Sequence, residues 1–390
     1  GIALGIEPIH LMDSVVAFFL MEATRMDRFR SAFEEVEDPR TGNRLEHDLQ
    51  EVLFIALCAS LCGAESCVDM ADFAEAKEEV LRGFLKLEGG PPSHDTFSRI
   101  FRLLDPEQFH DAFQRFMAAF AATRAEVVAI DGKSLRRSFD RAAGTSPLLL
   151  VSAWASQERL VLGQVKVAQE SNEITAVPAL LELLSLEGVT VTVDAMHCQR
   201  ATAEAIVDKG GDYVMAVKAN QPALHGDVKL LMDDPGAPAD DSAETIDGDH
   251  GRIETRRAEV LHDVEWLTEI HGWPGLAAVG KVTATREIEG RATTSTRYYI
   301  TSRALSATEL NRLARGHWGI ENSLHWVLDV VMNEDQARAR KDNAPENLAL
   351  LRRLALNIIK RNTDKGSNRL KFKRAGWDNR FLEKIISEIA

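Results

Sequence analysis

The chain has 390 residues, which exceeds one typical domain and predicts two or three folding units. A hydrophobic content of 45% is typical of a soluble globular protein. The formal net charge of -14 excludes a protein that is coated uniformly with nucleic-acid-binding surface.

The charge is unevenly distributed along the chain. Residues 336–374 contain twelve Lys and Arg against three Asp and Glu, a net of +9, so the remaining residues carry -23. A basic segment on an acidic protein indicates one surface that faces a polyanion. The alternative is a solvated surface helix with exposed Lys and Arg side chains.

The cysteines and the apolar segments indicate a cytoplasmic protein. Four cysteines without the paired short spacings of a zinc site predict buried free thiols in a reducing compartment. The apolar run Ser14–Met21 has eight residues, too few to span a bilayer, and no signal peptide is recognisable. We expect no membrane contact, and we expect residues 1–25 to form an extension outside the folded core.

Residues 26–122 are predicted to be all-helical. Apolar residues recur with helical spacing from Leu49 to Ser60, and Ser93 and Asp105 are predicted N-caps of two further helices. This region holds ten Lys and Arg against nineteen Asp and Glu, a net of -9. A helical domain that reads DNA is usually basic on one face. We therefore favour a structural, docking or dimerising role for it over recognition of DNA ends.

From Val127 onward, short apolar strands alternate with helices. The predicted strands are Val127–Asp131, Pro147–Ser156, Leu160–Val167, Val189–Asp194 and Tyr213–Val217. The predicted helices between them are Glu173–Leu184 and Gln199–Lys209. Strands and helices in this order predict an α/β fold with a mixed sheet.

Residues from about 221 to 303 interrupt this alternation. They predict an inserted, mostly β subdomain, in which an acidic loop, Asp233–Asp249, is followed by three strands. Those strands are Ile253–Val260, Leu276–Arg286 and Thr293–Thr301. Two helices come after the insertion. Leu310–Asp329 has an apolar stripe for the core, and Leu348–Arg361 follows a capping-box-like pair, Asn343 and Glu346.

Three carboxylates stand out as candidate site residues. In Val189–Asp194 the valines occupy one face, so Asp194 leaves on the polar face, at the strand end where α/β proteins place ligands. Asp131 closes another strand. On the late helix, Glu321 belongs to a stripe at four-residue spacing that is separate from the apolar stripe; it comprises His317, Glu321, His325 and Asp329. If this helix packs against the sheet edge, Glu321 can approach both aspartates.

This grouping suits the cleavage of phosphodiester bonds. Two Mg²⁺ ions about 4 Å apart can activate an attacking oxygen and stabilise the departing one, and Mg²⁺ prefers hard oxygen ligands. The carboxylates would then be metal ligands and not general acids. Each also has a structural interpretation, because Asp at a strand end often caps a turn and a helical Glu is usually solvated. Zinc at His317 and His325 is disfavoured, since these residues lie eight positions apart.

Taken together, the motifs resemble those of the DDE transposases of bacterial insertion sequences, in the branch that includes the H-repeat-associated proteins. The resemblance covers nearly the whole chain after Met26, and the order and number of the motifs make it specific. The motifs are Asp38-Pro39-Arg40, His47-Asp48-Leu49, Pro92–Phe97, Ala129–Lys133, Ser171–Ala176, Val193–Gln199, Lys218–Gln221, His250–Glu254, His317–Asn322 and Asn333-Glu334-Asp335.

The resemblance implies a ribonuclease-H-like mixed-sheet core at 123–362 with a β-rich insertion at about 221–303. An all-helical N-terminal domain at 26–122 would precede it, and a basic C-terminal tail and helix at 363–390 would follow. It also implies that Asp131, Asp194 and Glu321 are the catalytic residues and hold Mg²⁺ (or Mn²⁺). Water would first free a 3′-hydroxyl at the transposon end, and that hydroxyl would then attack target DNA.

The implied partners are transposon ends and target DNA, bound by a homodimer or a higher oligomer in the bacterial nucleoid. Phosphate contacts position DNA without reading its sequence. The expected DNA-contacting residues are Lys133, Lys218, Arg252, Arg315, His317, Arg338 and Arg340. Relatives in the wider group often carry Tyr and Arg before the glutamate and Lys after it. Here the nearby groups are Arg315, His317 and Asp329, so the roles in DNA-end handling do not carry over.

Two other functions stay open on sequence grounds. One is a transposase-derived DNA-binding protein that no longer cuts DNA. The other is a nuclease on the same core that performs no strand transfer. The inserted β region and the long basic tail favour a transposase over a minimal nuclease.

Overall fold

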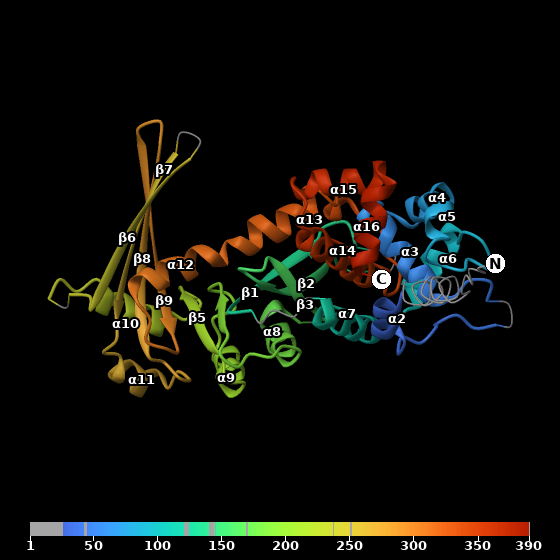
Figure 1. Cartoon of the computed structure of the whole chain (residues 1–390). Helices are drawn as coiled ribbons and strands as arrows, with labels where there is room; N and C mark the ends of the chain where they lie inside the picture. The colour runs from blue at the N-terminus through green and yellow to red at the C-terminus, as the bar shows by residue number, and fades with distance from the viewer. Residues whose placement is uncertain are drawn as a thin grey trace, which may run out of the picture. The chain divides into compact units, whose positions relative to one another are not determined.

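The computed structural model describes residues 26–42, 45–120, 125–139, 144, 146–168, 171–236, 238–249 and 252–389. The expected N-terminal extension, 1–25, and the motif residues His250 and Gly251 lie outside this range. The chain divides into two compact units (Figure 1). One unit contains the residues before 123 and those from 328 onward, and the other contains residues 123–327.

The secondary-structure elements of the first unit are all helices among its described residues. Its helices before residue 123 are α2 (Asp27–Phe33), α3 (Leu49–Leu61), α4 (Cys67–Ala76), α5 (Glu78–Leu81), α6 (His94–Leu103) and α7 (Pro106–Phe120). Its later helices are η2 (Glu334–Gln336), α14 (Ala344–Arg361), α15 (Asn368–Trp377) and α16 (Asn379–Ile389). Helix α14 is buried along most of its length and packs against α3, α6 and α7. This packing joins the later helices to the early ones.

The boundary between the units falls at residue 327, whereas the sequence predicts a catalytic domain that extends to residue 362. The intervening stretch includes α14, whose buried face covers the early helices. A buried ion pair links two parts of this stretch, with Arg353 Nη1 2.7 Å from Glu334 Oε1 and both side chains inaccessible to solvent.

Two of the predicted helix caps are confirmed, and the third is confirmed in position only. Ser93 Oγ accepts a hydrogen bond from the Thr96 backbone N–H, and Asp105 Oδ1 accepts one from Glu107. Asn343 is at the N-cap position of α14, but its side chain makes no cap hydrogen bond; its Nδ2 donates to the carbonyl oxygen of Leu104. The four cysteines are free thiols, as predicted, although only Cys58 and Cys198 are fully buried.

The second unit is built on one mixed sheet, which confirms the α/β class. Its strands are β1 (Val127–Leu135), β2 (Leu148–Ala155), β3 (Leu160–Lys166), β4 (Thr190–Val193), β5 (Asp212–Val217), β6 (Asp241–Asp249), β7 (Arg252–Leu261), β8 (Ala278–Ile288) and β9 (Arg291–Thr301). Their order across the sheet is β3-β2-β1-β4-β5-β9-β8-β7-β6. The pairs β1–β4 and β4–β5 are parallel, and the others are antiparallel.

Helices cover both faces of this sheet (Figure 1). One face packs against helices α8 (Glu173–Glu182), α9 (Arg200–Asp208), α10 (Pro222–Met232) and α11 (Glu265–His271). The other face carries α12 (Ala307–His317). The alternation of strand side chains decides which residue faces which layer. In β1, Val128 and Ile130 join the α8–α11 layer, and Val127 joins the α12 layer.

The inserted region is β-rich, but it is not a separate subdomain. Strand β9 pairs with β5, so β6–β9 continue the core sheet. The prediction of an acidic loop at Asp233–Asp249 was wrong for its second half, which forms β6 and pairs with β7 along its whole length. Strand β6 lies at the sheet edge, where exposed charged side chains discourage pairing with other chains. Such a composition is easily taken for a loop. Helix α11 was not predicted either.

The helix predicted at Leu310–Asp329 is confirmed as a helical path with a change of winding. Helix α12 leads into a π-helical segment, η1 (Glu321–His325), and then into α13 (Trp326–Val330). A π-helical turn inside an α-helix is rare and frequently occurs at functional sites. Helix α12 packs closely on β8 at Gly280. A Cβ added at Gly280 would lie 2.3 Å from Leu310 Cδ2 and would collide with it.

Among the described residues, no helix combines the length and the apolar character needed to cross a bilayer.

Candidate active site

Parallel pairing of β1 with β4 brings two predicted site residues together. The last residues of this pairing are Ile130 and Val193, so Asp131 and Asp194 follow side by side where the pairing stops. The prediction that a strand ends at Asp131 was wrong, because β1 continues to Leu135 in its pairing with β2. Neighbouring strands lie about 4.8 Å apart, which makes the two aspartates adjacent. Both project toward the α12 layer, because they alternate with side chains that pack on the opposite face.

The helical path from α12 to η1 supplies the third carboxylate, Glu321. Two histidines on the same stripe hold this path against the strands. His317 Nδ1 lies 3.1 Å from Thr192 Oγ1 on β4, and His325 Nδ1 lies 3.6 Å from Asp131 Oδ2 on β1. The predicted stripe therefore faces the place where β1 and β4 stop pairing, next to the two aspartates. Glu321 shares a cavity of about 160 Å³ with Asp194.

Electrostatic repulsion links the three carboxylates. Burial raises the pKa of Asp131 to about 7, and the negative charges of Asp194 and Glu321 add to the rise. The pKa of Glu321, which is exposed, is also raised, by partial desolvation and by Asp194, although Arg297 opposes the shift. A carboxyl group whose pKa lies near neutrality is typical of a functional site.

Asp194 differs from Asp131 because it has a cationic neighbour. Burial alone would raise the pKa of Asp194, but His197 lowers it below its usual value. His197 is fully buried, with Nδ1 2.8 Å from Asp194 Oδ1 and Nε2 3.2 Å from Glu173 Oε2. Neither contact has the alignment of a hydrogen bond, so both are ion pairs. Although burial opposes it, these two carboxylates raise the pKa of His197 to about 9.

His317 carries no positive charge near pH 7. Burial lowers its pKa to about 4, and the positive charges of His197 and Arg297 contribute. The sequence places His317 among the residues that contact DNA phosphates. Its neutral ring can still exchange hydrogen bonds there, but it offers no ionic attraction.

The site has the donor chemistry of a Mg²⁺ centre without its full geometry. Three carboxylates supply hard oxygen ligands, and their mutual repulsion is what a divalent cation would relieve. Within the part of the chain that the structure describes, however, no three His, Cys, Asp or Glu side chains converge closely enough to hold a metal ion. Each aspartate is instead approached by a histidine, at His325 and His197.

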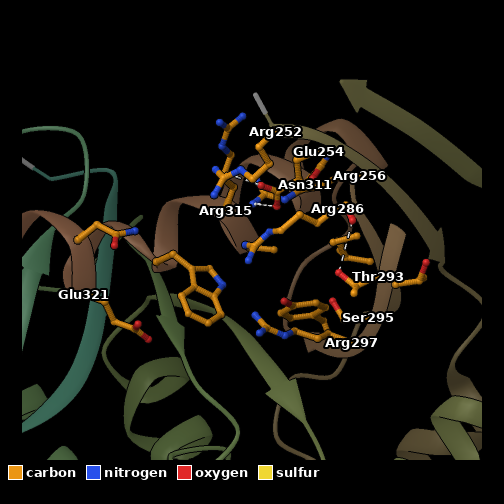
Figure 2. A pocket seen from close by; sticks show the side chains of 17 residues that line it. Arg252, Glu254, Arg256, Arg286, Thr293, Ser295, Arg297, Asn311, Arg315 and Glu321 are labelled. Carbon is orange, nitrogen blue, oxygen red and sulfur yellow. Dashed lines mark hydrogen bonds and ion pairs between the residues drawn. The ribbon is translucent and has the colours of Figure 1, made fainter. Parts of the chain in front are cut away.

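Arginine side chains line a larger cavity beside Glu321 (Figure 2). This cavity, which we call the arginine groove, has a volume of about 590 Å³. Its arginines are Arg252, Arg256, Arg286, Arg297 and Arg315. Five arginines against the lining residues Glu254 and Glu321 leave a formal charge of +3. The guanidinium of Arg297 also stacks on Trp318, at 4.4 Å from the ring centre.

The strand register gathers these arginines on one face. Glu254 of β7 lies opposite Arg286 of β8, and Val282 of β8 lies opposite Arg297 of β9. This face continues onto the core packed against α12, which is the layer that the two aspartates face. The arginine groove and the carboxylates therefore share one side of the sheet. Both cavities include Arg297, Trp318 and Glu321 in their linings.

The other expected DNA-contacting residues lie in different surroundings. Lys218 lines the smaller cavity with Asp194, and Arg252 and Arg315 line the arginine groove. Lys133 is buried, with 8% of its surface exposed, so it is not presented to solvent in this conformation. Arg338 and Arg340 are exposed and belong to the helical unit, between η2 and α14.

The sequence did not indicate several residues of the site as functional candidates. They are Glu173, His197, Arg256, Arg286 and Arg297. The spacing of three between Asp194 and His197 was a usable signal, and so was the period-two run from Arg252 to Arg256. The grouping of Arg286 and Arg297 with that run depends on strand register, which one sequence does not give.

Comparison with known proteins identifies the family. Residues 122–358 match the family described as "Transposase DDE domain", and residues 30–117 match the one described as "DDE_Tnp_1-associated". The chain belongs to the DDE transposase family. It lies in the branch of the H-repeat-associated proteins, as the motifs indicate.

Relatives support this assignment over most of the chain. The H repeat-associated putative transposase YhhI of Escherichia coli (strain K12) is 35% identical over 362 residues, which cover 90% of this chain and 96% of that protein. The "Uncharacterized protein in dhlA 3'region" of Xanthobacter autotrophicus is 44% identical over 293 residues, 74% of this chain and 98% of that protein.

A solved piggyBac transposase synaptic complex with hairpin DNA aligns with a TM-score of 0.44 and 11% identity, over 92% of this chain and 77% of that one.

We expect Asp131→Asn to stabilise the metal-free protein by more at about pH 8 than at about pH 5. The pKa of Asp131 is raised from 3.8 to about 7, so between these values the folded protein holds a proton that the unfolded chain has released. The free energy of unfolding therefore falls as the pH rises through this window, and asparagine escapes the loss. The gain at the higher pH should exceed the gain at the lower pH by at least about 1 kcal/mol, since one pKa unit corresponds to about 1.4 kcal/mol.

Thermal unfolding in a chelator at the two pH values measures this difference. The exposed Asp263, changed to Asn, is the control and should behave alike at both pH values. A gain for Asp131→Asn that is equal at both pH values, or larger at the lower one, would contradict the electrostatic account.

Proposed function

We propose that this protein is a transposase that binds the ends of its own insertion sequence, cuts them in the presence of Mg²⁺ or Mn²⁺, and joins them to target DNA. The observation that carries the proposal is that Asp131, Asp194 and Glu321 lie near one another on one side of the sheet. They come from distant parts of the chain, and their electrostatic coupling supports a shared role. Membership of the DDE transposase family gives that role its chemistry.

We further propose that β1–β5 form a ribonuclease-H-like core. Three antiparallel strands, β3, β2 and β1, are followed across the sheet by β4 and β5, which run parallel to β1. The candidate carboxylates lie at the edge where β1 and β4 end their pairing. The limits of this catalytic domain and of a separate helical N-terminal domain belong to the same proposal.

Asp131, Asp194 and Glu321 would hold the divalent cations. When bound, such ions lower the energy of the attacking and leaving oxygens of a phosphodiester. The three side chains must move to bind a metal ion together. In the described residues, no three His, Cys, Asp or Glu side chains converge closely enough to hold one. Asp131 is partly restrained by His325 and Asp194 by His197, so Glu321, which is exposed, has the greatest freedom to move.

The arginine groove would hold DNA phosphates next to this site. Guanidinium groups bind phosphate oxygens in pairs of hydrogen bonds, and five of them surround one hollow. Lys218 would extend the contact surface toward Asp194. Arg338 and Arg340, on the helical unit, would give a second contact region for DNA. Assembly of two or more copies on DNA would bring a pair of ends together.

Alanine at Asp131, Asp194 or Glu321 should abolish Mg²⁺-dependent nicking of the element ends and leave DNA binding intact. Loss of one metal ligand removes several kcal/mol of transition-state stabilisation, so we expect a fall in rate of about 10³-fold or more. Gel assays of nicked and joined products, with filter binding in parallel, measure both properties. The exposed Glu269, changed to Ala, is the matched control.

The same assay separates the alternatives. A parent protein that binds the ends but never nicks them would be a DNA-binding protein that no longer cuts. Nicking without joined products would indicate a nuclease without strand transfer. A single variant with near-normal cleavage would remove that residue from the site.

Alanine at Arg252 or Arg286 should weaken binding of the end DNA at all salt concentrations tested. Each lost phosphate contact should reduce the slope of log affinity against log salt by about 1. Titrations at a series of salt concentrations measure the slope. Arg82→Ala, at an exposed arginine of the helical unit, is the control. Slopes that stay at the parent value in both groove variants would exclude the groove as a phosphate-binding surface.

A further inference from the structure

One buried side chain links the two aspartate-bearing segments. The carboxylate of Glu173, at the start of α8, lies against Gly132, the residue after Asp131. On its other side, Glu173 Oε2 is 3.2 Å from His197 Nε2. His197 in turn places Nδ1 2.8 Å from Asp194 Oδ1. A chain of charged groups thus runs from the β1 strand, through a helix, to the residue that follows β4.

The position of Glu173 is not the usual one for an acid in a first helical turn. Such an acid normally stays in water, where it stabilises the positive end of the helix dipole. The side chain of Glu173 is only 16% exposed, and that of His197 is 0% exposed. Burying an ionisable pair is unfavourable unless the pair is well matched in charge, so a purely helix-stabilising glutamate has no reason to turn inward here.

Gly132 provides the space that Glu173 occupies. A Cβ added at Gly132 would lie 2.0 Å from Glu173 Oε2, and its three nearest heavy atoms all belong to the Glu173 carboxylate. Gly132 does not have a positive φ, so its backbone would accept alanine. The reason for glycine at this position is therefore the approach of Glu173.

The contacts of Asp194 are concentrated on one oxygen. Oδ1 accepts a hydrogen bond from the His197 backbone N–H at 3.1 Å and also faces the His197 ring. This arrangement fixes the rotation of the carboxylate and leaves Oδ2 for a cation. Outer groups that orient metal ligands in this way typically change metal affinity or activity by about 10–100-fold when they are removed.

We propose that Glu173 and His197 are positioning residues that orient Asp194 for metal binding, and that Gly132 is a glycine because Glu173 needs its space. The proposal rests on the proposed function, in which Asp194 is a metal ligand. Glu173 and His197 touch neither DNA nor metal in this scheme. Their effect reaches the reaction only through the carboxylate of Asp194.

A test of coupling between Gly132 and Glu173 separates positioning from a general structural role. Binding of Mn²⁺ alone to the full chain, without DNA, is measured by calorimetry. Glu173→Ala and His197→Ala should each weaken Mn²⁺ binding about 10–100-fold. Gly132→Ala should weaken it similarly in the parent, but should add nothing in the Glu173→Ala background, where the colliding carboxylate is gone.

Matched variants complete the design. Glu182→Ala changes a largely exposed glutamate of the same helix and should bind Mn²⁺ like the parent. Glu173→Gln keeps an oxygen toward His197 and should recover part of the lost affinity. Melting temperatures identify any variant that fails to fold. If His197→Ala is such a variant, the comparison of Gly132→Ala in the two backgrounds decides the question.

The outcomes distinguish this proposal from the proposed function. Parent-like Mn²⁺ binding by folded Glu173→Ala and His197→Ala would overturn the positioning role. So would an equal effect of Gly132→Ala in both backgrounds. A parent protein that binds no Mn²⁺, or an Asp194→Ala variant that binds it as well as the parent, would instead overturn the metal site itself.

Discussion

The parallel pairing of β1 with β4 is the constraint on which the rest of the site depends. It places Asp131 and Asp194 side by side where the two strands stop pairing, partly removed from water. Two neighbouring, partly buried carboxylates repel each other, and Glu321 adds a third negative charge. Cationic groups offset part of this repulsion. His197 lies next to Asp194, and Arg297 opposes the rise in the pKa of Glu321. Asp131, which lacks such strong compensation, has the pKa that rises to about 7.

The same sheet explains how a second surface comes to lie beside the carboxylates. Because β9 pairs with β5, the inserted strands extend the core and do not form an independent body. Strand alternation then carries Arg252, Arg286 and Arg297 to the side of the sheet that α12 covers. A polyanion bound by these arginines would lie along the wall that carries Glu321. An overall charge of -14 is thus compatible with a strongly basic local surface.

The sequence predicted the parts of this arrangement that depend on local pattern. Alternation of valine with threonine identified β4 and the side on which Asp194 leaves it, and helical spacing identified the stripe with Glu321. Strand order and register depend on contacts between distant segments, so neither the continuation of the sheet nor the grouping of Arg297 was predicted. Strand β6 was missed because an edge strand needs no apolar face. Glu173 has the sequence position of an ordinary helix-start acid, and its contacts with Gly132 and His197 distinguish it.

A crystal structure of the protein with Mn²⁺ and an end duplex, with the metal located by its anomalous scattering, tests the central claim most directly. The account predicts metal bound by oxygens of Asp131, Asp194 and Glu321, with the side chains drawn closer than in the metal-free protein. Mn²⁺ bound elsewhere in a complex that still cuts its DNA would contradict it.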